Sequence, residues 1–394
     1  MRLNRLSLTN FRAFSRLEMN LPGRILVLVG DNAQGKTSLI EAVYFLATFA
    51  SFQAGTDRQM INFAATPDAI AVARITAEFE RGGESHRLEV RIIQEPVLPA
   101  GSRTRKEILL DGVKKSAADA VGRFSAVIFL PQMTRIIEGS PEDRRRFLNM
   151  ALSQVVPGYA RAMSDYAQVI TRRNALLKML AEQHSEADQL TYWDDQLILH
   201  GSQMALARAQ AVQELENQAG RLHQKLTGGL EKLNLHYKPA IDLNGGNTAE
   251  LTLEGVQAAF RQNLQRVRNE EIVRGITVCG PHRDDLCFLC NDLDMNDFGS
   301  RGQIRTAMLS LKLAEVNWMK ARTGEWPVLL LDETLAELDL HRRSDLQHTL
   351  QECDQGILTT TDLHQFSDEF IADCNIWRVD AGCVSVEAPP TKAA

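Results

Sequence analysis

The stretch Gly30-Asp31-Asn32-Ala33-Gln34-Gly35-Lys36-Thr37 decides the fold, because it fits the spacing G-x-x-x-x-G-K-[ST]. In such a loop the glycines let backbone N–H groups turn inward on phosphates. Lys36 can then reach the outer phosphates, and the Thr37 hydroxyl can bind Mg²⁺. The alternative is a plain glycine turn. The neighbours favour the phosphate loop, since an apolar run (24–29) precedes it as a strand and residues 36–49 follow as a helix.

A second acidic segment completes the predicted nucleotide site. Residues 328–333 read Val-Leu-Leu-Leu-Asp-Glu, four apolar residues followed by two acids. A buried strand would carry Asp332 to the phosphate loop, where it can hold Mg²⁺ through water and Glu333 can polarise the attacking water. Many strands end in acids, so the segment indicates a site only together with the loop.

Three further segments resemble parts of ABC ATPases. Residues 336–339 (Ala-Glu-Leu-Asp) fit the D-loop, which includes Asp339, and Gln132 fits the Q-loop that senses Mg²⁺, although any loop glutamine would look alike. The segment 299–303 (Gly-Ser-Arg-Gly-Gln) opens a helix and resembles the signature, in which Ser300 and Gly302 would grip a γ-phosphate. The alternative is an ordinary helix cap. A signature serves a partner's ATP, so this interpretation implies a head-to-tail homodimer.

Composition narrows the class of protein. The chain has 394 residues, with 44% hydrophobic and 24% charged residues, as in soluble globular proteins of more than one lobe. No apolar stretch is long enough for a membrane span, and the first residues lack a signal core. All six cysteines lie in the last third, which fits a reducing cytoplasm. The net charge of −6 excludes a uniformly basic DNA-coating protein but allows a local basic face.

The order of expected elements predicts an α/β fold in which both chain ends build one ATPase head. Strands are expected within 2–30, 69–80, 87–94, 106–112, 276–279, 285–290, 327–331 and up to 361. Helices are expected through 142–236 and at 249–271 and 302–322. We therefore expect an ABC-type head from 1–140 and 272–394, with 141–271 as an inserted helical lobe.

The chain resembles the RecF family over nearly its whole length. The resemblance rests on the phosphate loop and on the segments 8–14 (Leu-Thr-Asn-Phe-Arg-Ala-Phe), 139–148, 172–177, 280–286 (Gly-Pro-His-Arg-Asp-Asp-Leu) and 311–315. The Gly-Pro-His-Arg-Asp-Asp run is the most specific of them, because general ABC proteins lack it. We also assign Arg12 in the opening segment and Ser38 after the loop to the nucleotide-binding set.

The resemblance implies a DNA-repair ATPase of the SMC-like branch. Such a protein binds ATP and Mg²⁺, dimerises on DNA, hydrolyses ATP weakly with stimulation by DNA, and acts with RecO and RecR to load RecA at gaps, supporting fork recovery and SOS induction. Some positions depart from the family. Glu333 stands where many RecF sequences have aspartate, Arg301 is unusual in the signature, and the segment 51–53 (Ser-Phe-Gln) replaces a more basic one. The switch position offers Thr360 or Thr361, with His364 as a weaker candidate.

Arginines of the helical lobe are candidates for DNA contact. Guanidinium groups suit phosphate oxygens and give sequence-independent binding that weakens with salt. The alternative is a solvated helix face paired with nearby acids. Aromatic residues make up only 6% of the chain, so backbone recognition of duplex or junction DNA is favoured over base stacking. The candidates are Arg144, Arg145, Arg146, Arg172 and Arg173.

Two other patterns have plain structural interpretations. His282 with Arg283, Asp284 and Asp285 suggests a metal or catalytic site, but we favour a satisfied polar turn. Cys287 and the cysteine three residues later have C-x-x-C spacing, yet no second pair lies at a zinc-like distance, so they are expected in a strand core.

Two rival functions share the nucleotide motifs. A transporter ATPase subunit would have a signature closer to Leu-Ser-Gly-Gly-Gln and a shorter helical region. A RecF-like ATPase of defence or regulation would work without RecR. No nuclease-type cluster of acids is evident, so DNA cleavage is not expected.

Overall fold

The computed structural model describes residues 1–62, 70–96, 102–182, 187–243 and 251–387. The chain divides into two compact units. Unit 1 combines Met1–Met133 with Met319–Ala394, and unit 2 is Thr134–Trp318. Both chain ends thus build one unit around an inserted one, as the motif order predicts.

Unit 1 contains two six-stranded sheets. One is antiparallel, with the order β2-β1-β4-β5-β6-β7. The other has the order β15-β14-β3-β13-β12-β8, and all its pairs are parallel except β14 with β15. The strands are β1 (Arg2–Phe11), β2 (Phe14–Asn20), β3 (Ile25–Val29), β4 (Ala71–Arg81), β5 (Glu84–Pro96), β6 (Ser102–Leu110), β7 (Val113–Lys115), β8 (Ala126–Phe129), β12 (Val328–Asp332), β13 (Gly356–Thr360), β14 (Asn375–Asp380) and β15 (Cys383–Glu387).

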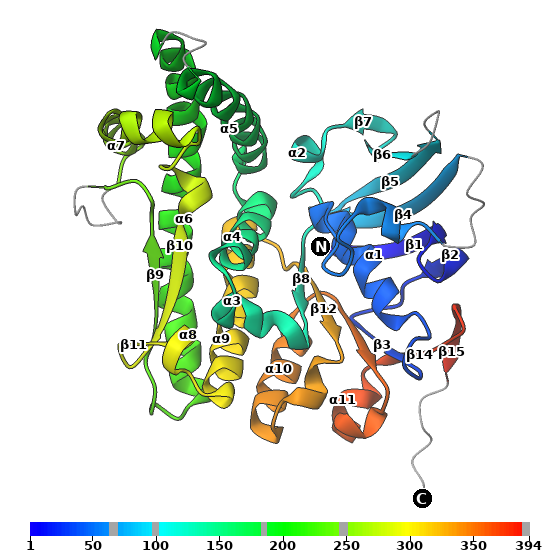
Figure 1. Cartoon of the computed structure of the whole chain (residues 1–394). Coiled ribbons are helices and arrows are strands. Elements are labelled where there is room, and N and C mark those ends of the chain that lie inside the picture. Colours follow the sequence, from blue (N-terminus) through cyan, green and yellow to red (C-terminus); the bar gives the residue numbers. More distant parts are fainter. Residues whose placement is uncertain (63–69, 97–101, 183–186, 244–250, 388–394) are drawn as a thin grey trace, which may run out of the picture. The chain divides into compact units, whose positions relative to one another are not determined.

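Helix α1 (Lys36–Thr48) lies between the two sheets of unit 1 (Figure 1). It contacts β8, β12 and β13 on one side and β4 and β5 on the other. Ile40 and Phe45 are fully buried there, and burial of such a side chain stabilises a fold by about 1.5–3 kcal/mol. Strands β3 and β12 are apolar at nearly every position and are buried throughout, as is usual for central strands of a parallel sheet. The other helices of this unit are α2 (Ala117–Ala120), α10 (Leu340–Glu352) and α11 (Asp368–Ala372).

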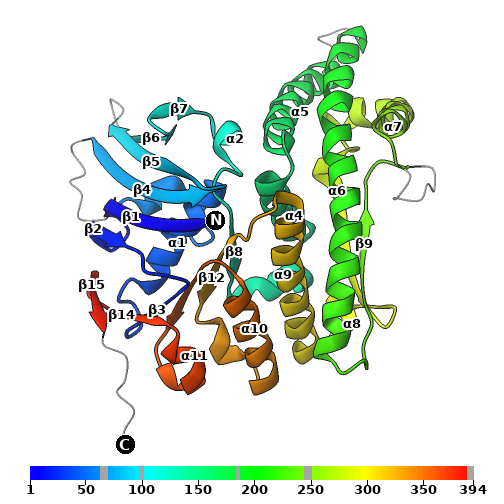
Figure 2. The same cartoon turned by 180° about the vertical axis from the view of Figure 1, so that it is seen from behind.

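Unit 2 is mainly helical. Its longest helix, α6, runs beside strand β9, and α5, α6 and α7 contact one another (Figure 2). Its elements are α3 (Arg135–Glu138), α4 (Pro141–Val155), α5 (Tyr159–Ala181), α6 (Leu190–Leu226), α7 (Leu253–Arg274), α8 (Met295–Phe298), most of α9 (Arg301–Thr323), and the three-stranded sheet β9 (Leu233–Lys238), β10 (Asp285–Cys290) and β11 (Leu293–Asp294).

The unit boundaries differ from the expected ones, because 134–140 and 272–318 belong to unit 2. The reason is long-range pairing: β10 hydrogen-bonds to β9 over its whole length and also contacts α4. An apolar alternation marks a strand but does not reveal its partner. The segment 276–279, expected as a strand, is irregular, and Thr277 donates from its backbone N–H to Asn174 Oδ1 at 2.8 Å.

Candidate nucleotide site

The phosphate loop sits at the end of β3 in a conformation that requires glycine. The Gly30 N–H donates to Thr360 O at 3.3 Å, and a Cβ at Gly30 would lie 2.2 Å from Val379 O. Gly35 has φ +108° at the start of α1, which L side chains rarely adopt. The loop is therefore held closely against β13 and β14, with the first N–H groups of α1 directed into it.

Lys36 is buried inside this loop. Its side chain is 3% exposed, and Nζ donates to Gly30 O at 2.7 Å and to Asp31 O at 2.8 Å. Nζ also lies 3.4 Å from Glu333 Oε1. Two backbone carbonyls hold the Lys36 ammonium group inside the phosphate loop. In this position the ammonium group is suited to bind a phosphate that the loop would surround.

Asp332 and Thr37 meet although 295 positions separate them. The Thr37 hydroxyl donates to Asp332 Oδ1 at 3.0 Å, and the Thr359 hydroxyl donates to the same oxygen at 2.6 Å. Burial raises the pKa of Asp332, and the two hydroxyl hydrogen bonds oppose that rise. A buried carboxylate beside a loop hydroxyl is the pair of oxygen ligands that holds Mg²⁺ in such sites. These residues therefore fit a magnesium–nucleotide.

Glu333 follows in a strained backbone position. Its φ is +50°, in the left-handed region that non-glycine residues rarely adopt. The Glu333 N–H donates to Thr359 Oγ1 at 3.1 Å, and the side chain is 41% exposed. Strain of this kind often accompanies functional positions. With this backbone conformation, the Glu333 carboxylate lies beside Lys36 Nζ.

Thr359 is the site residue that the sequence did not single out. It lies opposite Asp332 in the parallel register of β12 and β13, and it touches both acidic residues through one hydroxyl. The sequence signal that could have identified Thr359 was a hydroxyl residue near the end of an apolar strand. Of the expected switch positions, Thr360 turns to Asp362, whereas Thr361 and His364 are exposed.

Four other predicted nucleotide residues lie in unit 1. Arg12 forms a bidentate ion pair with buried Glu41 at 2.7 Å for both contacts, so it anchors α1. Ser38 is half-buried in the first turn of α1, and Gln132 is exposed just after β8. Asp339 caps α10 by accepting from the Arg342 N–H at 3.0 Å. Their roles toward nucleotide remain predictions.

The predicted signature lies in unit 2 at the start of α9. Ser300, Arg301 and Gly302 are all exposed. Gln303 and Ser300 form reciprocal hydrogen bonds between side chain and backbone at 2.9 and 3.3 Å, which is a capping box. The segment therefore presents an exposed helix N-terminus, the geometry that binds anions.

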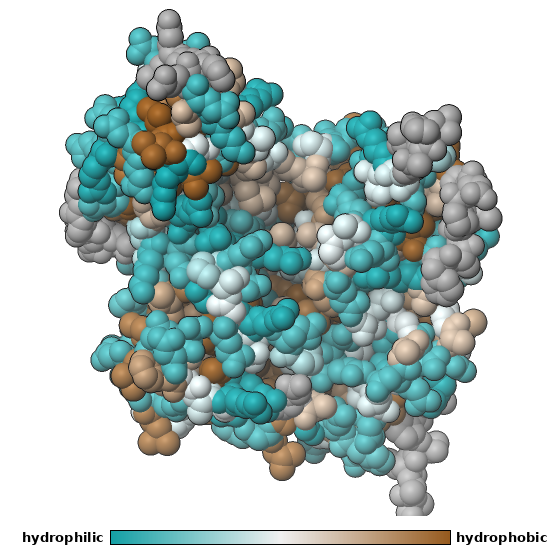
Figure 3. All heavy atoms as spheres, in the orientation of Figure 1, coloured by the Kyte–Doolittle hydropathy of each residue, from teal (hydrophilic) through white to brown (hydrophobic). Residues whose placement is uncertain are grey.

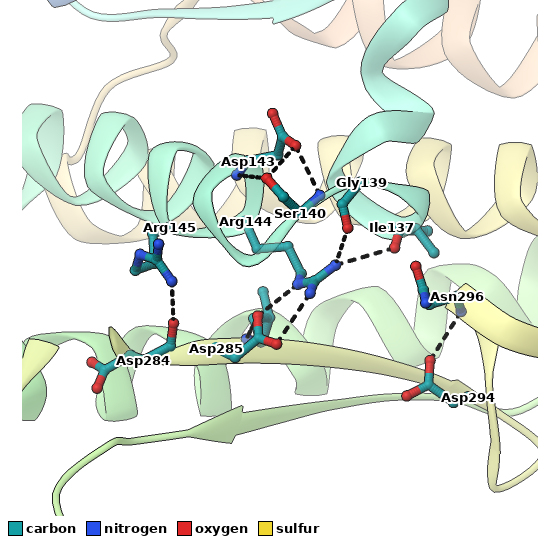
Figure 4. A network of polar contacts seen from close by, with 11 residues as sticks. Ile137, Gly139, Ser140, Asp143, Arg144, Arg145, Asp284, Asp285, Asp294 and Asn296 are labelled. Carbon is teal, nitrogen blue, oxygen red and sulfur yellow. Dashed lines mark hydrogen bonds and ion pairs between the residues drawn. The ribbon is translucent and has the colours of Figure 1, made fainter. Parts of the chain in front are cut away.

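Figure 4 shows that two of the predicted DNA-binding arginines are directed into unit 2. Arg144 is 8% exposed and makes two hydrogen bonds to the Asp285 carboxylate, at 2.7 and 3.0 Å. Arg145 donates to Asp284 O at 2.8 Å and is half-buried, and this burial lowers its pKa. The guanidinium of Arg144 joins α4 to β10, so its geometry supports an internal role in place of DNA contact.

The adjacent arginines of α5 have opposite environments. Arg173 is fully buried and donates to Glu271 at 2.6 Å and to Asp194 at 2.8 Å. DNA cannot reach it in this fold. Arg172 is exposed and lies 5.7 Å from the centre of the Trp193 ring. Arg146 is also exposed.

The Gly-Pro-His-Arg-Asp-Asp run forms a satisfied polar turn inside unit 2. Asp284 is 1% exposed and accepts from Arg208 at 2.7 Å and from the Tyr237 hydroxyl. His282 Nδ1 lies 2.7 Å from the Tyr166 hydroxyl, and burial lowers the pKa of His282 to about 4. The imidazole is therefore neutral at pH 7. The favoured interpretation, a structural turn, agrees with these contacts.

Comparisons with known proteins place this site in a class. The family model described as RecF/RecN/SMC N terminal domain matches residues 2–375. A solved SMC head bound to a ScpA winged-helix domain has the same fold, with a TM-score of 0.52, 14% identity, and coverage of 98% of this chain and 97% of that one. Fold and site together define an ABC-type ATPase head of the SMC kind.

Within this class, the chain belongs to the RecF family. It is 38% identical over 392 residues to the DNA replication and repair protein RecF of Roseiflexus castenholzii, covering 97% of this chain and 99% of the relative. The RecF protein of Chloroflexus aurantiacus is 37% identical, with 98% and 99% covered. A structure of the recombination mediator protein RecF with ATP matches with a TM-score of 0.84 and 26% identity, covering 98% of each chain. Of the helices that the structure describes, none has the length and apolar character of a membrane span.

Proposed function

We propose that this chain is an ATP-dependent DNA-binding protein of recombinational DNA repair that works as a head-to-tail homodimer in the cytoplasm. The contact between Thr37 and Asp332, beside buried Lys36, carries the proposal. It brings a hydroxyl, a carboxylate and an ammonium from distant parts of the chain to one phosphate loop. The relatives called DNA replication and repair protein RecF and the ATP-bound RecF structure support the same function.

Each residue of the site has a separate task in ATP binding and hydrolysis. Lys36 would neutralise the outer phosphates, while Thr37 and Asp332 would hold Mg²⁺, Asp332 through water. The bound magnesium–nucleotide supplies the phosphoanhydride bond that is cleaved. Glu333 orients and polarises the attacking water once Lys36 has turned from its carboxylate to the phosphates. The left-handed backbone at Glu333 keeps that carboxylate at the loop.

The second copy completes the site through its signature. Ser300 and Gly302 are exposed at the N-terminus of α9, where backbone N–H groups and the helix dipole favour a phosphate. Apolar side chains gather over β11 and α8, next to this segment in the chain (Figure 3). Leu293 is 59% and Phe298 is 70% exposed, so both are available to a partner surface. A second chain docked on the signature would bury them.

DNA binding is assigned to exposed arginines of unit 2. Arg146 and Arg172 are exposed, and their charge suits phosphate oxygens. Because Arg144 and Arg173 are internal, the predicted basic face is smaller than the sequence suggests. Binding of duplex or junction DNA through few contacts should be weak for one copy and stronger for the dimer, which links affinity to ATP.

We further propose RecR, acting with RecO, as the protein partner, and RecA loading and SOS induction as the outcome. The support is the description of a similar structure as a recombination mediator protein of the RecFOR pathway. A RecF-like ATPase without RecR is the alternative. Sedimentation of the ATP-bound protein with purified RecR separates the two, because only the first gives a larger complex.

The decisive experiment measures DNA binding with the Glu333→Gln variant, which should bind ATP but hydrolyse it slowly. Fluorescence anisotropy on gapped duplex DNA should show at least about tenfold tighter binding with Mg²⁺ and ATP than without nucleotide. Arg172→Glu should weaken binding and flatten its salt dependence, by about 0.9 in the log–log slope for each DNA phosphate that the protein no longer neutralises. Arg221→Glu, a matched reversal at an exposed position of α6, should have little effect. Equal affinity with and without ATP would overturn the proposal.

A further inference from the structure

A group of three potential metal ligands lies in unit 2, away from the residues of the nucleotide site in sequence. It consists of His223 near the end of α6, Glu231 in the following loop, and Cys290 at the end of β10. One ligand atom of each residue lies within 4.8 Å of the other two. His223 is fully buried and Cys290 is 6% exposed. The three residues come from segments that only the folded chain brings together.

The contacts around His223 place its Nε2 beside a carboxylate. The Ser310 hydroxyl donates its single hydrogen to Thr306 O at 2.8 Å. Ser310 Oγ lies 3.2 Å from His223 Nδ1, so it accepts there and Nδ1 carries the proton. His223 Nε2 lies 3.1 Å from Glu231 Oε2. A proton on Nε2 would make this contact an ion pair, whereas a metal ion beside the two atoms would take both as ligands.

The thiol of Cys290 borders the same space. Gln303 Nε2 donates to Glu231 Oε1 at 2.9 Å and lies 4.0 Å from Cys290 Sγ. Burial, together with the Glu231 carboxylate, raises the pKa of the Cys290 thiol. A neutral thiol in this place contributes little, whereas a cation would convert it into a thiolate ligand.

We propose that His223, Glu231 and Cys290 bind a Zn²⁺ ion, with a water or the Gln303 amide as the fourth ligand. Imidazole, carboxylate and thiolate are all zinc ligands, and the thiolate disfavours Mg²⁺ and Ca²⁺. Binding releases the thiol proton of Cys290 to solvent and forms one Zn–S bond without any change of oxidation state. The Nδ1–H to Ser310 contact is the outer-shell bond that typically orients a zinc-bound histidine.

The site would connect three elements near the signature. His223 belongs to α6, Cys290 to β10, and Gln303 to the first turn of α9, close after Ser300. The fully occupied cluster would fix the start of α9 to the sheet of unit 2. Zinc would therefore stabilise this part of the fold whether or not nucleotide is bound.

Only one cysteine of the C-x-x-C pattern belongs to this group of potential metal ligands. Cys287 and Cys290 lie three apart on β10, where alternate residues face opposite sides, and Cys287 is half-buried whereas Cys290 is buried. The pair cannot chelate one ion together. Cys287 is therefore a matched control for Cys290.

The test titrates Co²⁺ into full-length protein that was first treated with a chelator and kept anaerobic with a phosphine reductant. The background carries Cys383→Ser, which removes the exposed thiol. Tetrahedral Co²⁺ bound to a thiolate should give an intense near-ultraviolet charge-transfer band that saturates at one equivalent and disappears on addition of Zn²⁺. Cys290→Ser should abolish that band, and Cys287→Ser should retain it.

Two further measurements complete the design. Metal analysis of protein purified without chelators should find about one zinc per chain, and Zn²⁺ should raise the melting temperature of the parent but not of His223→Gln. Absence of a saturable Co²⁺ band in the parent, or its persistence in Cys290→Ser, would overturn the proposal. In that case His223 and Glu231 form an imidazolium–carboxylate ion pair.

Discussion

Asp332 combines two demands that oppose each other at the residue scale. Its carboxylate is buried, and burial raises its pKa, so the nucleotide-free fold is less stable when the group is charged. The same negative charge is what a magnesium–nucleotide needs. Thr37 and Thr359 reduce the conflict by donating hydroxyl hydrogens to one oxygen. The buried charge of Asp332 therefore favours magnesium–nucleotide binding at a cost in stability.

Asp332→Asn should separate these two effects. Because the folded pKa lies above the unfolded one, the parent loses stability as pH rises through both values, and the variant does not. Without nucleotide at about pH 7.5, the melting temperature should rise by about 1–3 °C. The stabilisation by Mg²⁺ and ATP should disappear. Thermal unfolding between about pH 4 and 7.5 checks both, and a less stable variant with intact ATP stabilisation would contradict the assignment.

Lys36→Ala should remove tight ATP binding. A hydrogen bond to a charged group contributes about 1.5–3 kcal/mol, so affinity should fall by about 10- to 150-fold. Titration with a fluorescent ATP analogue measures the change. Lys115→Ala, at an exposed position of β7, should bind as the parent does. An unchanged dissociation constant for Lys36→Ala would show that the loop does not hold phosphate.

At the scale of elements, buried ion pairs connect the helices of unit 2 to one another and to its sheet. Arg173 joins α5 to α7 through Glu271 and reaches Asp194 of α6. Arg208 of α6 reaches Asp284, next to β10. Such pairs add little over an apolar core, but breaking one leaves a buried charge without its counterion.

Arg173→Met should destabilise the protein by about 3–5 kcal/mol, because buried Glu271 would lose its ion-pair partner. Arg172→Met changes the preceding, exposed residue and should shift stability by only about 0.5 kcal/mol. Chemical denaturation of both variants gives the comparison. Arg172→Met should weaken DNA binding more than Arg173→Met does, provided that Arg173→Met is assayed below its melting temperature. Equal stability of the two variants would refute the structural role of Arg173.

At the scale of the whole molecule, the two halves of the proposed ATP-binding interface belong to different units. The phosphate loop and Asp332 are in unit 1, whereas Ser300 is in unit 2. A dimer with ATP at its interface uses the signature of one copy and the loop of the other. Nucleotide occupancy and dimerisation are then linked, so each strengthens the other by the same factor.

Ser300→Arg should leave ATP binding within about threefold of the parent but prevent ATP-induced dimerisation, since a bulky cation would occupy the place of the hydroxyl. Light scattering compares Glu333→Gln with the Glu333→Gln, Ser300→Arg double variant, each with and without ATP. Only the first should double its mass. Gln224→Arg, an exposed change on α6, provides the charge-matched control. Dimerisation of the double variant would contradict the assignment of Ser300 to the signature.

The sequence by itself determined the class of fold and predicted the residues that we propose for the nucleotide site. The loop around Lys36 has the spacing typical of a phosphate loop, and the apolar run before Asp332 indicates a strand buried on both faces. Both signals are local: the chemistry of a few neighbouring residues specifies them. The RecF resemblance followed from such segments taken in order.

The tertiary structure alone decided which distant residues meet. It placed Thr359 opposite Asp332, buried Arg173 against Glu271, moved the 272–318 segment into unit 2, and brought His223 to Cys290. The physical reason is that strand register and helix packing depend on the burial of the whole fold. A residue's own neighbours in sequence carry no record of its partner across a sheet or between helices.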